Sequence, residues 1–216
     1  MSINAMNRSR ENLPVTIFAD WHSPIISATI YLRVARRGSI IADVIRLECM
    51  NCLTQPEITQ WLSDQSVTPA PYGNAESPTH YLQFNAPSRP LANASFIRQF
   101  LKLTNDEILV HVTDWPTYEP SEMAVVDALR HEWNESRNLI DAAGHLIPAT
   151  ETELAIALFG HTGNFEWNAY LYLPNDLATL YNWEGEVYDF WSNDEATYHA
   201  LTKLASSFGL APTIAG

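Results

Sequence analysis

Three short segments towards the carboxyl end of the chain carry the β-branched and aromatic residues typical of strands. They read NAYLYLP, LATLYNW and GEVYDFW, and only a few turn-type residues separate each from the next. Connections this short join antiparallel neighbours, because a parallel pair needs a crossover of a dozen or more residues. The sequence therefore predicts an antiparallel meander between residues 168 and 191.

The last two of these segments meet in YNWEGEVYDFW, residues 181–191, where five aromatic rings stand among three carboxylates. Alternation along a strand places Asp189 and Trp191 on one side and Tyr188 and Phe190 on the other. Rings on both sides, with acids between them, argue against one stacking platform for bases or sugars. Packing in the core, or a rim that binds a protein, fits the pattern better.

Further strands and helices are predicted around the meander. The strand candidates are HYLQFNA and EILVHVTDW, and the helix candidates are LANASFIRQFLKL, SEMAVVDALRHEW, TETELAIALFG and NDEATYHALTKLASSFG. Three local signals support these helices: Ser121 as an N-cap, a capping box of Thr150 with Glu153, and an end at Gly209. The pattern predicts an α+β fold, with a mixed or antiparallel sheet flanked by helices.

The amino-terminal part of the chain is predicted as a helical section, residues 1–65, that packs on the body. The segment TQPEITQWL, with Pro56 suited to a first helical turn, supports this interpretation. The stretch SVTPAPYGNAESPT reads as a connecting loop. An acidic α+β domain, residues 75–216, follows it.

The two cysteines, Cys49 and Cys52, form a single C-x-x-C within DVIRLECMNCL. This segment reads as the interior of an apolar helix, so the two thiols are interpreted as buried side chains one turn apart. Redox chemistry and metal binding remain alternatives, but no second ligand pair has zinc-site spacing. We expect no bound cofactor and no stoichiometric metal.

Charge divides the chain unevenly. Residues 1–102 hold 9 lysines and arginines against 7 acids, whereas residues 103–216 hold 3 against 18, or net charges of +2 and −15. A field of this sign repels nucleic acid and anionic lipid and attracts cationic partners. Solubility alone is the alternative explanation of the acidity.

A resemblance to a known family rests on the run LVHVTDWPTYEPSEMAVVDALRHEWNESRNLIDAAGHLI, followed by an apolar helix, EWNAYLYL and SNDEATYHAL. This part of the chain, roughly residues 96–202, resembles a family of uncharacterised bacterial cytosolic proteins with a T-D-W strand end, an L-R helix and an A-P-G-H turn. The present chain has Ala143 where the proline is expected. The resemblance implies a shared fold and carries no activity. The closing pattern of strand, strand and helix is also similar to acidic immunity proteins that neutralise bacterial toxins.

An enzymatic alternative rests on His111 and Asp114 at a strand end, with His145 in a turn expected to lie near them. Such a cluster could perform acid–base or metal-assisted hydrolysis or group transfer. His111 lies in an apolar strand, however, so a hydrogen-bonded core histidine is the alternative interpretation. No G-x-S-x-G, P-loop or G-x-G-x-x-G occurs, and HEWNE lacks the second histidine of a zincin helix.

The leading hypothesis is therefore a cytoplasmic, acidic binding protein, more an inhibitor than an enzyme, that occludes a basic protein such as a nuclease-type toxin. A hydrolase or transferase using His111, Asp114 and His145, and a structural or regulatory interaction module, remain the alternatives. No nucleic-acid or membrane partner is expected. The predicted partner-binding residues are aromatic anchors and adjacent acids: Asp114, Trp115, Tyr118, Glu119, Trp183, Glu184, Glu186, Tyr188 and Asp189.

Overall fold

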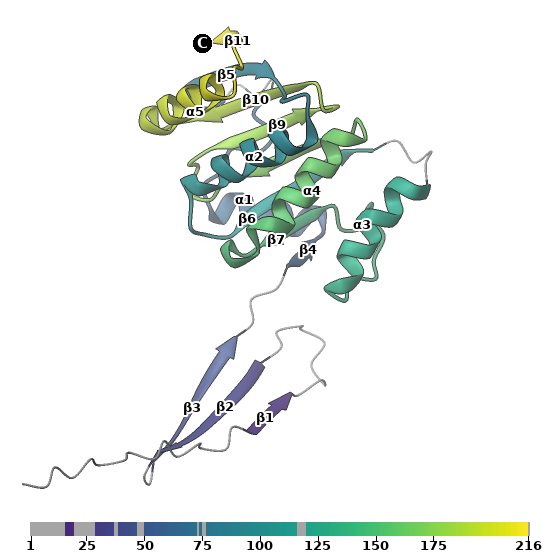
Figure 1. The fold of residues 1–216 in the computed structure, drawn as a ribbon, viewed down its shortest axis with the longest axis vertical. Coiled ribbons are helices and arrows are strands. Elements are labelled where there is room, and N and C mark those ends of the chain that lie inside the picture. Colours follow the sequence, from purple (N-terminus) through teal and green to yellow (C-terminus); the bar gives the residue numbers. More distant parts are fainter. Residues whose placement is uncertain are drawn as a thin grey trace, which may run out of the picture. The chain divides into compact units, whose positions relative to one another are not determined.

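A computed structural model describes residues 50–72, 74, 77–115 and 120–213, together with the backbone of strand segments 16–19, 29–36, 39–46 and 214–215. The chain divides into two units, Met1–Glu48 and Cys49–Gly216, each described here by itself. The larger unit contains every helix of the described residues (Figure 1). Its fold is α+β, as predicted.

The smaller unit is a three-stranded antiparallel sheet in the order β1-β2-β3. The prediction of a helical section is wrong for these segments, which are strands β1 (Thr16–Ala19), β2 (Thr29–Arg36) and β3 (Ser39–Arg46). The periodicity of a short apolar run rich in isoleucine and valine fits both a buried helix and a strand, so it could not distinguish between them.

The larger unit is built on one eight-stranded antiparallel sheet in the order β11-β5-β10-β9-β8-β6-β7-β4. The three meander segments form neighbouring strands β8, β9 and β10, as predicted. The strands of the sheet are β4 (Asn51–Leu53), β5 (His80–Asn85), β6 (Ile108–Asp114), β7 (Gly144–Ile147), β8 (Asn168–Tyr172), β9 (Thr179–Trp183), β10 (Val187–Ser192) and β11 (Pro212–Ala215).

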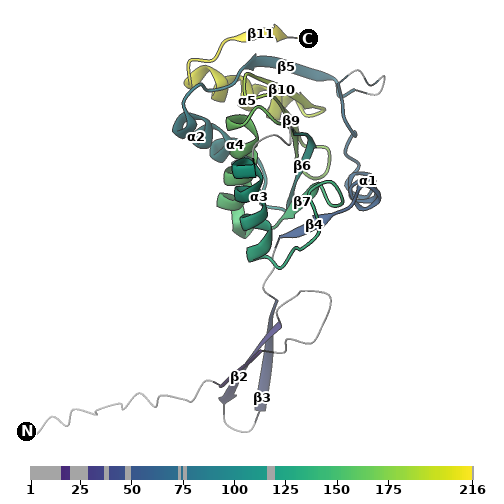
Figure 2. The ribbon, with the colours of Figure 1, turned by 90° about the vertical axis from the view of Figure 1, so that its right-hand side faces the viewer.

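Helices cover the two faces of this sheet unequally. Viewed edge-on, α2, α4 and α5 lie on one side and α1 on the other (Figure 2). The helices are α1 (Gln55–Asp64), α2 (Pro90–Phe100), α3 (Pro120–Glu132), α4 (Thr152–Asn164) and α5 (Glu195–Ser207), with short 3-10 helices η1 (Leu101–Leu103) and η2 (Ala149–Glu151).

The face under α2, α4 and α5 holds the main core. Fully buried rings and aliphatic side chains fill it, and they come from alternate positions of each strand. Tyr188 and Phe190 belong to this core, whereas Asp189 and Trp191 point to the other face, so the predicted alternation of the opening segment is confirmed.

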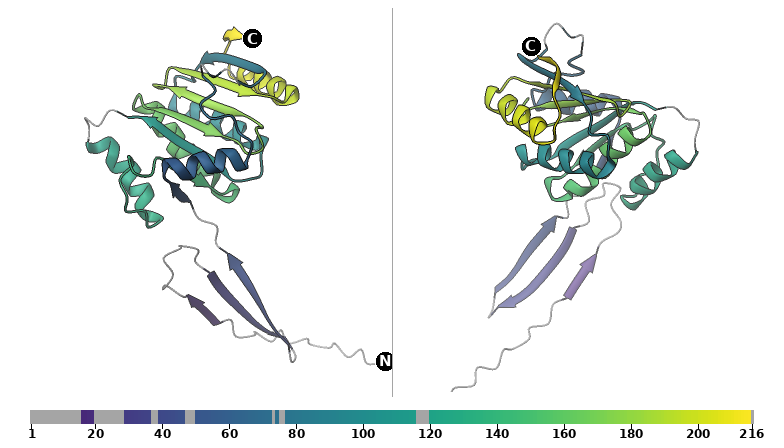
Figure 3. Two further views of the ribbon diagram at one scale, coloured as in Figure 1. Left: turned by 180° about the vertical axis from the view of Figure 1, so that it is seen from behind. Right: turned by 45° about the horizontal axis from the view of Figure 1, so that its top comes forward.

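The second face holds a smaller core under α1, which crosses the sheet when it is seen from behind (Figure 3, left). Ile58 of α1 packs directly on Gly144, where an added Cβ would lie 2.6 Å from its side chain. The helix begins at a capping box in which the Glu57 carboxylate accepts from the backbone N–H of Thr54 at 2.7 Å.

These elements correct the predicted boundaries. The body begins near Cys49 instead of residue 75, because β4 and α1 belong to its sheet and its second core. Cys52 lies in strand β4 instead of a helix, and Cys49 lies outside the described residues. Burial raises the pKa of the Cys52 thiol to about 11, so this side chain is kept protonated and unreactive.

Of the predicted helix-capping signals, some are wrong and others are confirmed. Helix α3 begins at Pro120, so Ser121 lies within its first turn instead of capping it. The expected capping box of Thr150 is absent because the Glu153 carboxylate binds Arg98 on α2 instead. By contrast, α5 is capped by Asp194, and the chain leaves it at Gly209.

Candidate functional site

Four strand ends meet at one end of the main sheet. Asp114, the last residue of β6, pairs with Asn168, the first residue of β8. Asn168 in turn accepts a hydrogen bond at 3.0 Å from the backbone N–H of Glu184, which follows β9. Acidic and aromatic residues from distant parts of the chain thus lie at the same end of these central strands. We call them the sheet-end surface: Asp114, Trp115, Glu166, Trp183, Glu184 and Glu186.

The turn between β9 and β10, which carries Glu184 and Glu186, has two successive residues with positive φ angles. Glu184 and Gly185 have φ angles of 47° and 76°, and the Glu186 N–H donates to the Trp183 carbonyl at 2.8 Å. Two central residues with positive φ define the type I′ hairpin turn. A Cβ added at Gly185 would lie 1.9 Å from the Gly163 carbonyl oxygen, so helix α4 touches the turn backbone directly.

Two buried asparagines hold this turn from below. The Asn182 side chain has no exposed surface, accepts from the Gly185 N–H at 3.1 Å and donates to the Trp167 carbonyl at 2.8 Å. The Asn168 side chain likewise accepts a hydrogen bond from the backbone N–H of Glu184. Buried amides with fixed partners leave the turn few alternative conformations. Glu184 and Glu186 are therefore presented in fixed positions at the protein surface.

Aromatic side chains line the second face beside this turn. The Trp183 ring lies 4.9 Å from the Tyr181 ring and 5.2 Å from the Tyr72 ring, at interplanar angles of 84° and 80°. Tyr181 continues the series towards Tyr170, at 4.1 Å between ring centres. We call the three rings of Tyr72, Tyr181 and Trp183 the aromatic corner.

A buried carboxylate lies under the aromatic corner. Asp189 has no exposed surface, and its two oxygens accept hydrogen bonds from Tyr81 Oη at 2.7 Å, Gln83 Nε2 at 2.9 Å and Trp183 Nε1. Burial, followed by the bond to Asp189, raises the pKa of the Tyr81 phenol well above its usual range. Asp189 therefore fixes the orientation of the Trp183 indole instead of contacting a partner.

The structure places five of the predicted partner-binding residues at one end of the sheet, namely Asp114, Trp115, Trp183, Glu184 and Glu186, with Trp115 packed against the main core and Trp183 against the core of the second face. Two others are corrected: Tyr188 lies in the main core, and Asp189 is buried under the aromatic corner, so neither reaches the surface. Tyr118 and Glu119 lie outside the described residues.

Sequence reasoning missed the residues that build the surface from below. Asn168 and Asn182 were not singled out, although asparagines within otherwise apolar strands demand hydrogen-bond partners. Glu166 and Tyr72 carry no local signal, because only the pairing of β8 with β9 and the course of the loop after α1 bring them near Trp183.

The proposed catalytic cluster is not assembled. Strand pairing places His111 opposite Gly144 and His145 opposite Val110, so the two imidazoles lie on opposite faces of the sheet. His145 is in strand β7, instead of the expected turn, and has no exposed surface. The structure therefore does not bring His111, Asp114 and His145 to one site.

His145 instead belongs to a buried structural cluster around Arg130, which is 1% exposed. Arg130 Nη1 donates to the Ala142 carbonyl at 2.7 Å and lies 2.9 Å from His145 Nε2, and Nη2 donates to the Arg137 carbonyl at 2.9 Å. Since a guanidinium only donates, His145 accepts through Nε2 and carries its proton on Nδ1, towards the Val110 carbonyl. The L-R helix and the A-A-G-H segment singled out in the sequence meet here.

Acid should destabilise the protein through these imidazoles. Burial, reinforced by Arg130, lowers the pKa of His145 to about 3, and burial lowers the pKa of His111 to about 4. The unfolded chain, with histidine pKa values near 6.5, then binds protons first as pH falls. Stability is complete above about pH 6.5 and is lost below it, by about 1.4 kcal/mol per pH unit for each histidine.

Urea unfolding between pH 6.5 and pH 5, above the main carboxylate range, measures this loss. His145→Gln, whose amide oxygen can still accept from Arg130, should reduce the slope of stability against pH. A wild-type stability that stays constant across this interval would contradict the prediction.

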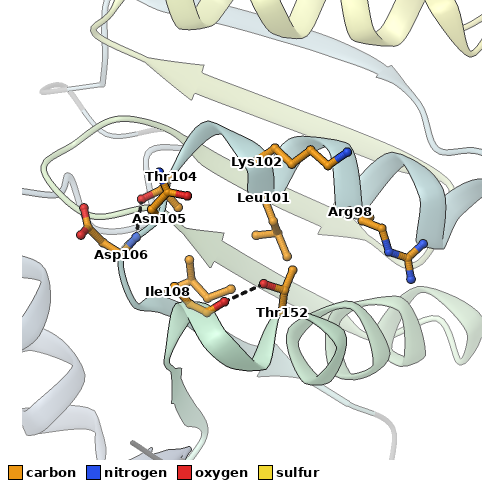
Figure 4. Close-up of a pocket in the computed structure, with 9 residues that line it drawn as sticks. Arg98, Leu101, Lys102, Thr104, Asn105, Asp106, Ile108 and Thr152 are labelled. Carbon is orange, nitrogen blue, oxygen red and sulfur yellow. Dashed lines mark hydrogen bonds between the residues drawn. The ribbon is translucent and has the colours of Figure 1, made fainter. Parts of the chain in front are cut away.

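One hollow of about 210 Å³ lies between the end of α2 and the start of α4 (Figure 4). Its cations already have partners, since Arg98 binds Glu153 through two hydrogen bonds and Lys102 donates to Gln99 at 3.1 Å. Asp106 adds the opposite charge, so the lining favours no ligand class. The lining residues are Arg98, Leu101, Lys102, Thr104, Asn105, Asp106, Ile108, Ala149 and Thr152.

Among the described residues, no group of three or more histidines, cysteines and acids is arranged to hold a metal ion. Within the same residues, no helix combines the length and the apolar character needed to cross a membrane. Comparison with family models, curated proteins and solved structures finds no match to this chain.

Proposed function

We propose that the protein is a cytoplasmic, acidic binding protein that occludes a basic protein through its sheet-end surface, in the manner of an immunity protein against a nuclease-type toxin. The observation that carries the proposal is the Glu184–Glu186 turn. Two buried asparagines and a direct contact with α4 hold this turn in a backbone conformation that few residues adopt.

Charge supports the same conclusion. In the part of the chain that the structure describes, ion pairs engage only Glu135, Glu153 and Glu195 among the acids. The carboxylates of the sheet-end surface are thus available to a partner, with the half-buried ring of Trp183 at the second face of the sheet and that of Trp115 at the main-core face. Aromatic anchors within a charged rim are the usual composition of a protein-binding surface.

A nuclease is the favoured kind of target because its substrate is a polyanion. A basic cleft that binds phosphates also attracts a rigid row of carboxylates, and the row then blocks entry of the nucleic acid. The net charge of −15 over residues 103–216 adds long-range attraction to such a cleft.

Charge reversal at the turn tests this function. The variant Glu184→Lys/Glu186→Lys should bind its basic partner about tenfold more slowly at low salt and should lose much of the salt dependence of association. The matched control, Asp106→Lys/Glu132→Lys, changes the net charge equally. Asp106 lies before β6, at the strand end opposite to Asp114, and Glu132 ends α3.

A partner is captured from host lysate and from cells that express the neighbouring gene. The rate at which the captured protein associates with the wild-type chain and with each variant is then measured at two ionic strengths. Nuclease activity of that protein on plasmid DNA should fall to background with one equivalent of the wild-type chain. An acidic partner, or equal losses in the turn and control variants, would show that the acidity serves solubility instead.

A further inference from the structure

The Trp183 indole beside the sheet-end surface is held in a single orientation. Its N–H donates to the Asp189 carboxylate, and Asp189 is itself fixed by Tyr81 and Gln83. A half-buried tryptophan normally retains rotameric freedom, which it loses on binding. Here that freedom is already lost in the unbound protein, as is expected of a preorganised contact residue.

Two further rings stand beside this indole. Tyr181 and Tyr72 are both nearly perpendicular to Trp183, at 84° and 80°. Tyr181 is almost fully buried, whereas Tyr72 is 58% exposed, so one wall of the aromatic corner is fixed and the other faces solvent. The Tyr72 ring and the exposed part of the Trp183 ring thus leave aromatic surface accessible to solvent.

The electrostatics of the corner favour a cation. The faces of aromatic rings carry negative potential, and the carboxylate at the indole N–H makes that potential more negative. Glu184 follows Trp183 directly. Burial is the main cause of the raised pKa of the Tyr181 phenol, and the negative charges of Asp114, Asp189 and Glu184 raise it further. An anion would be repelled at this position, and a neutral side chain would gain nothing from the carboxylates.

We propose that the aromatic corner receives one arginine side chain of the basic partner, with the guanidinium against the rings and its N–H groups towards Glu184. This inference rests on the proposed function and specifies what the surface recognises. Arginine is favoured over lysine because its planar, weakly hydrated group can stack on a ring while donating in its own plane to a carboxylate.

Titration with small molecules tests the corner without any protein partner. The ¹⁵N-labelled full chain is titrated with Nα-acetyl-arginine methylamide at constant ionic strength, and the seven indole N–H signals are followed. Trp183→Phe, which retains a ring, identifies the Trp183 signal by its absence and shows from the remaining spectrum that the fold persists. The uncharged isostere, the citrulline derivative, and the lysine derivative are titrated in parallel.

We expect the arginine compound to shift the Trp183 indole signal saturably at millimolar concentration, with weaker binding of the lysine compound and no saturable shift with citrulline. Glu184→Gln should weaken arginine binding about threefold or more, whereas Asp106→Asn should not. Equal responses to arginine and citrulline, or arginine shifts confined to other indoles, would overturn the inference.

The two proposals fail separately. If charge reversal at the turn abolishes capture of a basic protein while Trp183 ignores arginine, the acidic surface binds its partner without an arginine in the corner. If Trp183 responds to arginine as expected but no basic protein is captured, recognition of the guanidinium stands and the inhibitor role is withdrawn.

Discussion

Arg130→Ala should lower the free energy of unfolding by about 3 kcal/mol or more, the effect of removing one member of a buried polar cluster. The guanidinium donates to the Ala142 and Arg137 carbonyls and contacts His145. The contacts with Ala142 and His145 are buried, and the one with Arg137 is partly buried. Truncation leaves these acceptors without donors and opens a cavity behind α3. The helix and the segment leading into β7 would then lose their main connection.

Urea unfolding of the wild type, Arg130→Ala and Arg130→Lys at pH 7 measures this effect. Lysine should restore little stability, because a single ammonium cannot reproduce the two-pronged donation of a guanidinium. The exposed Arg89 provides the control, since Arg89→Ala removes the same side chain where water can replace it. A loss below about 1 kcal/mol in Arg130→Ala would refute a structural role for this cluster.

Gly185→Ala should destabilise the protein by about 3 kcal/mol or more, through a steric clash added to backbone strain. The new methyl group would lie 1.9 Å from the Gly163 carbonyl oxygen. The backbone fixes the position of a Cβ, and the oxygen is itself a backbone atom, so neither can rotate away. Either the β9–β10 turn or the end of α4 must shift, so binding by the sheet-end surface should fall together with stability.

Gly209→Ala separates the two contributions. Gly209 has almost the same φ, 73°, but nothing lies within 4 Å of an added Cβ. Its replacement should cost only the left-handed strain, about 1 kcal/mol. Thermal or urea unfolding of both variants gives the comparison, and similar losses at the two glycines would show that α4 does not press on the turn.

Much of the fold could be predicted because local signals agreed with the tertiary environment. The segments of β8, β9 and β10 combine strand-forming residues with connections too short for a crossover, so their antiparallel order followed directly. Pro56 in TQPEITQWL marked the start of α1 in the same way.

Predictions failed where a local pattern had two physical solutions. Thr54 with Glu57 and Thr150 with Glu153 have the same capping-box spacing, but Glu153 finds a stronger partner in Arg98. The apolar run of residues 39–46 satisfies a helix or a strand equally well, and only its pairing with β2 makes it β3.

Sequence patterns alone were enough to predict the class of fold, the acidity of residues 103–216 and the division of the rings of segment 181–191 between two faces, because charge is additive and strand alternation is local. Which acids lie close together depends instead on how distant strands pair. The pairing of β6 with β8 joins residues more than fifty positions apart and brings Asp114 beside Glu184. The pairing of β6 with β7 places His111 and His145 on opposite faces of the sheet, because their positions depend on the register between these strands, which no local pattern specifies.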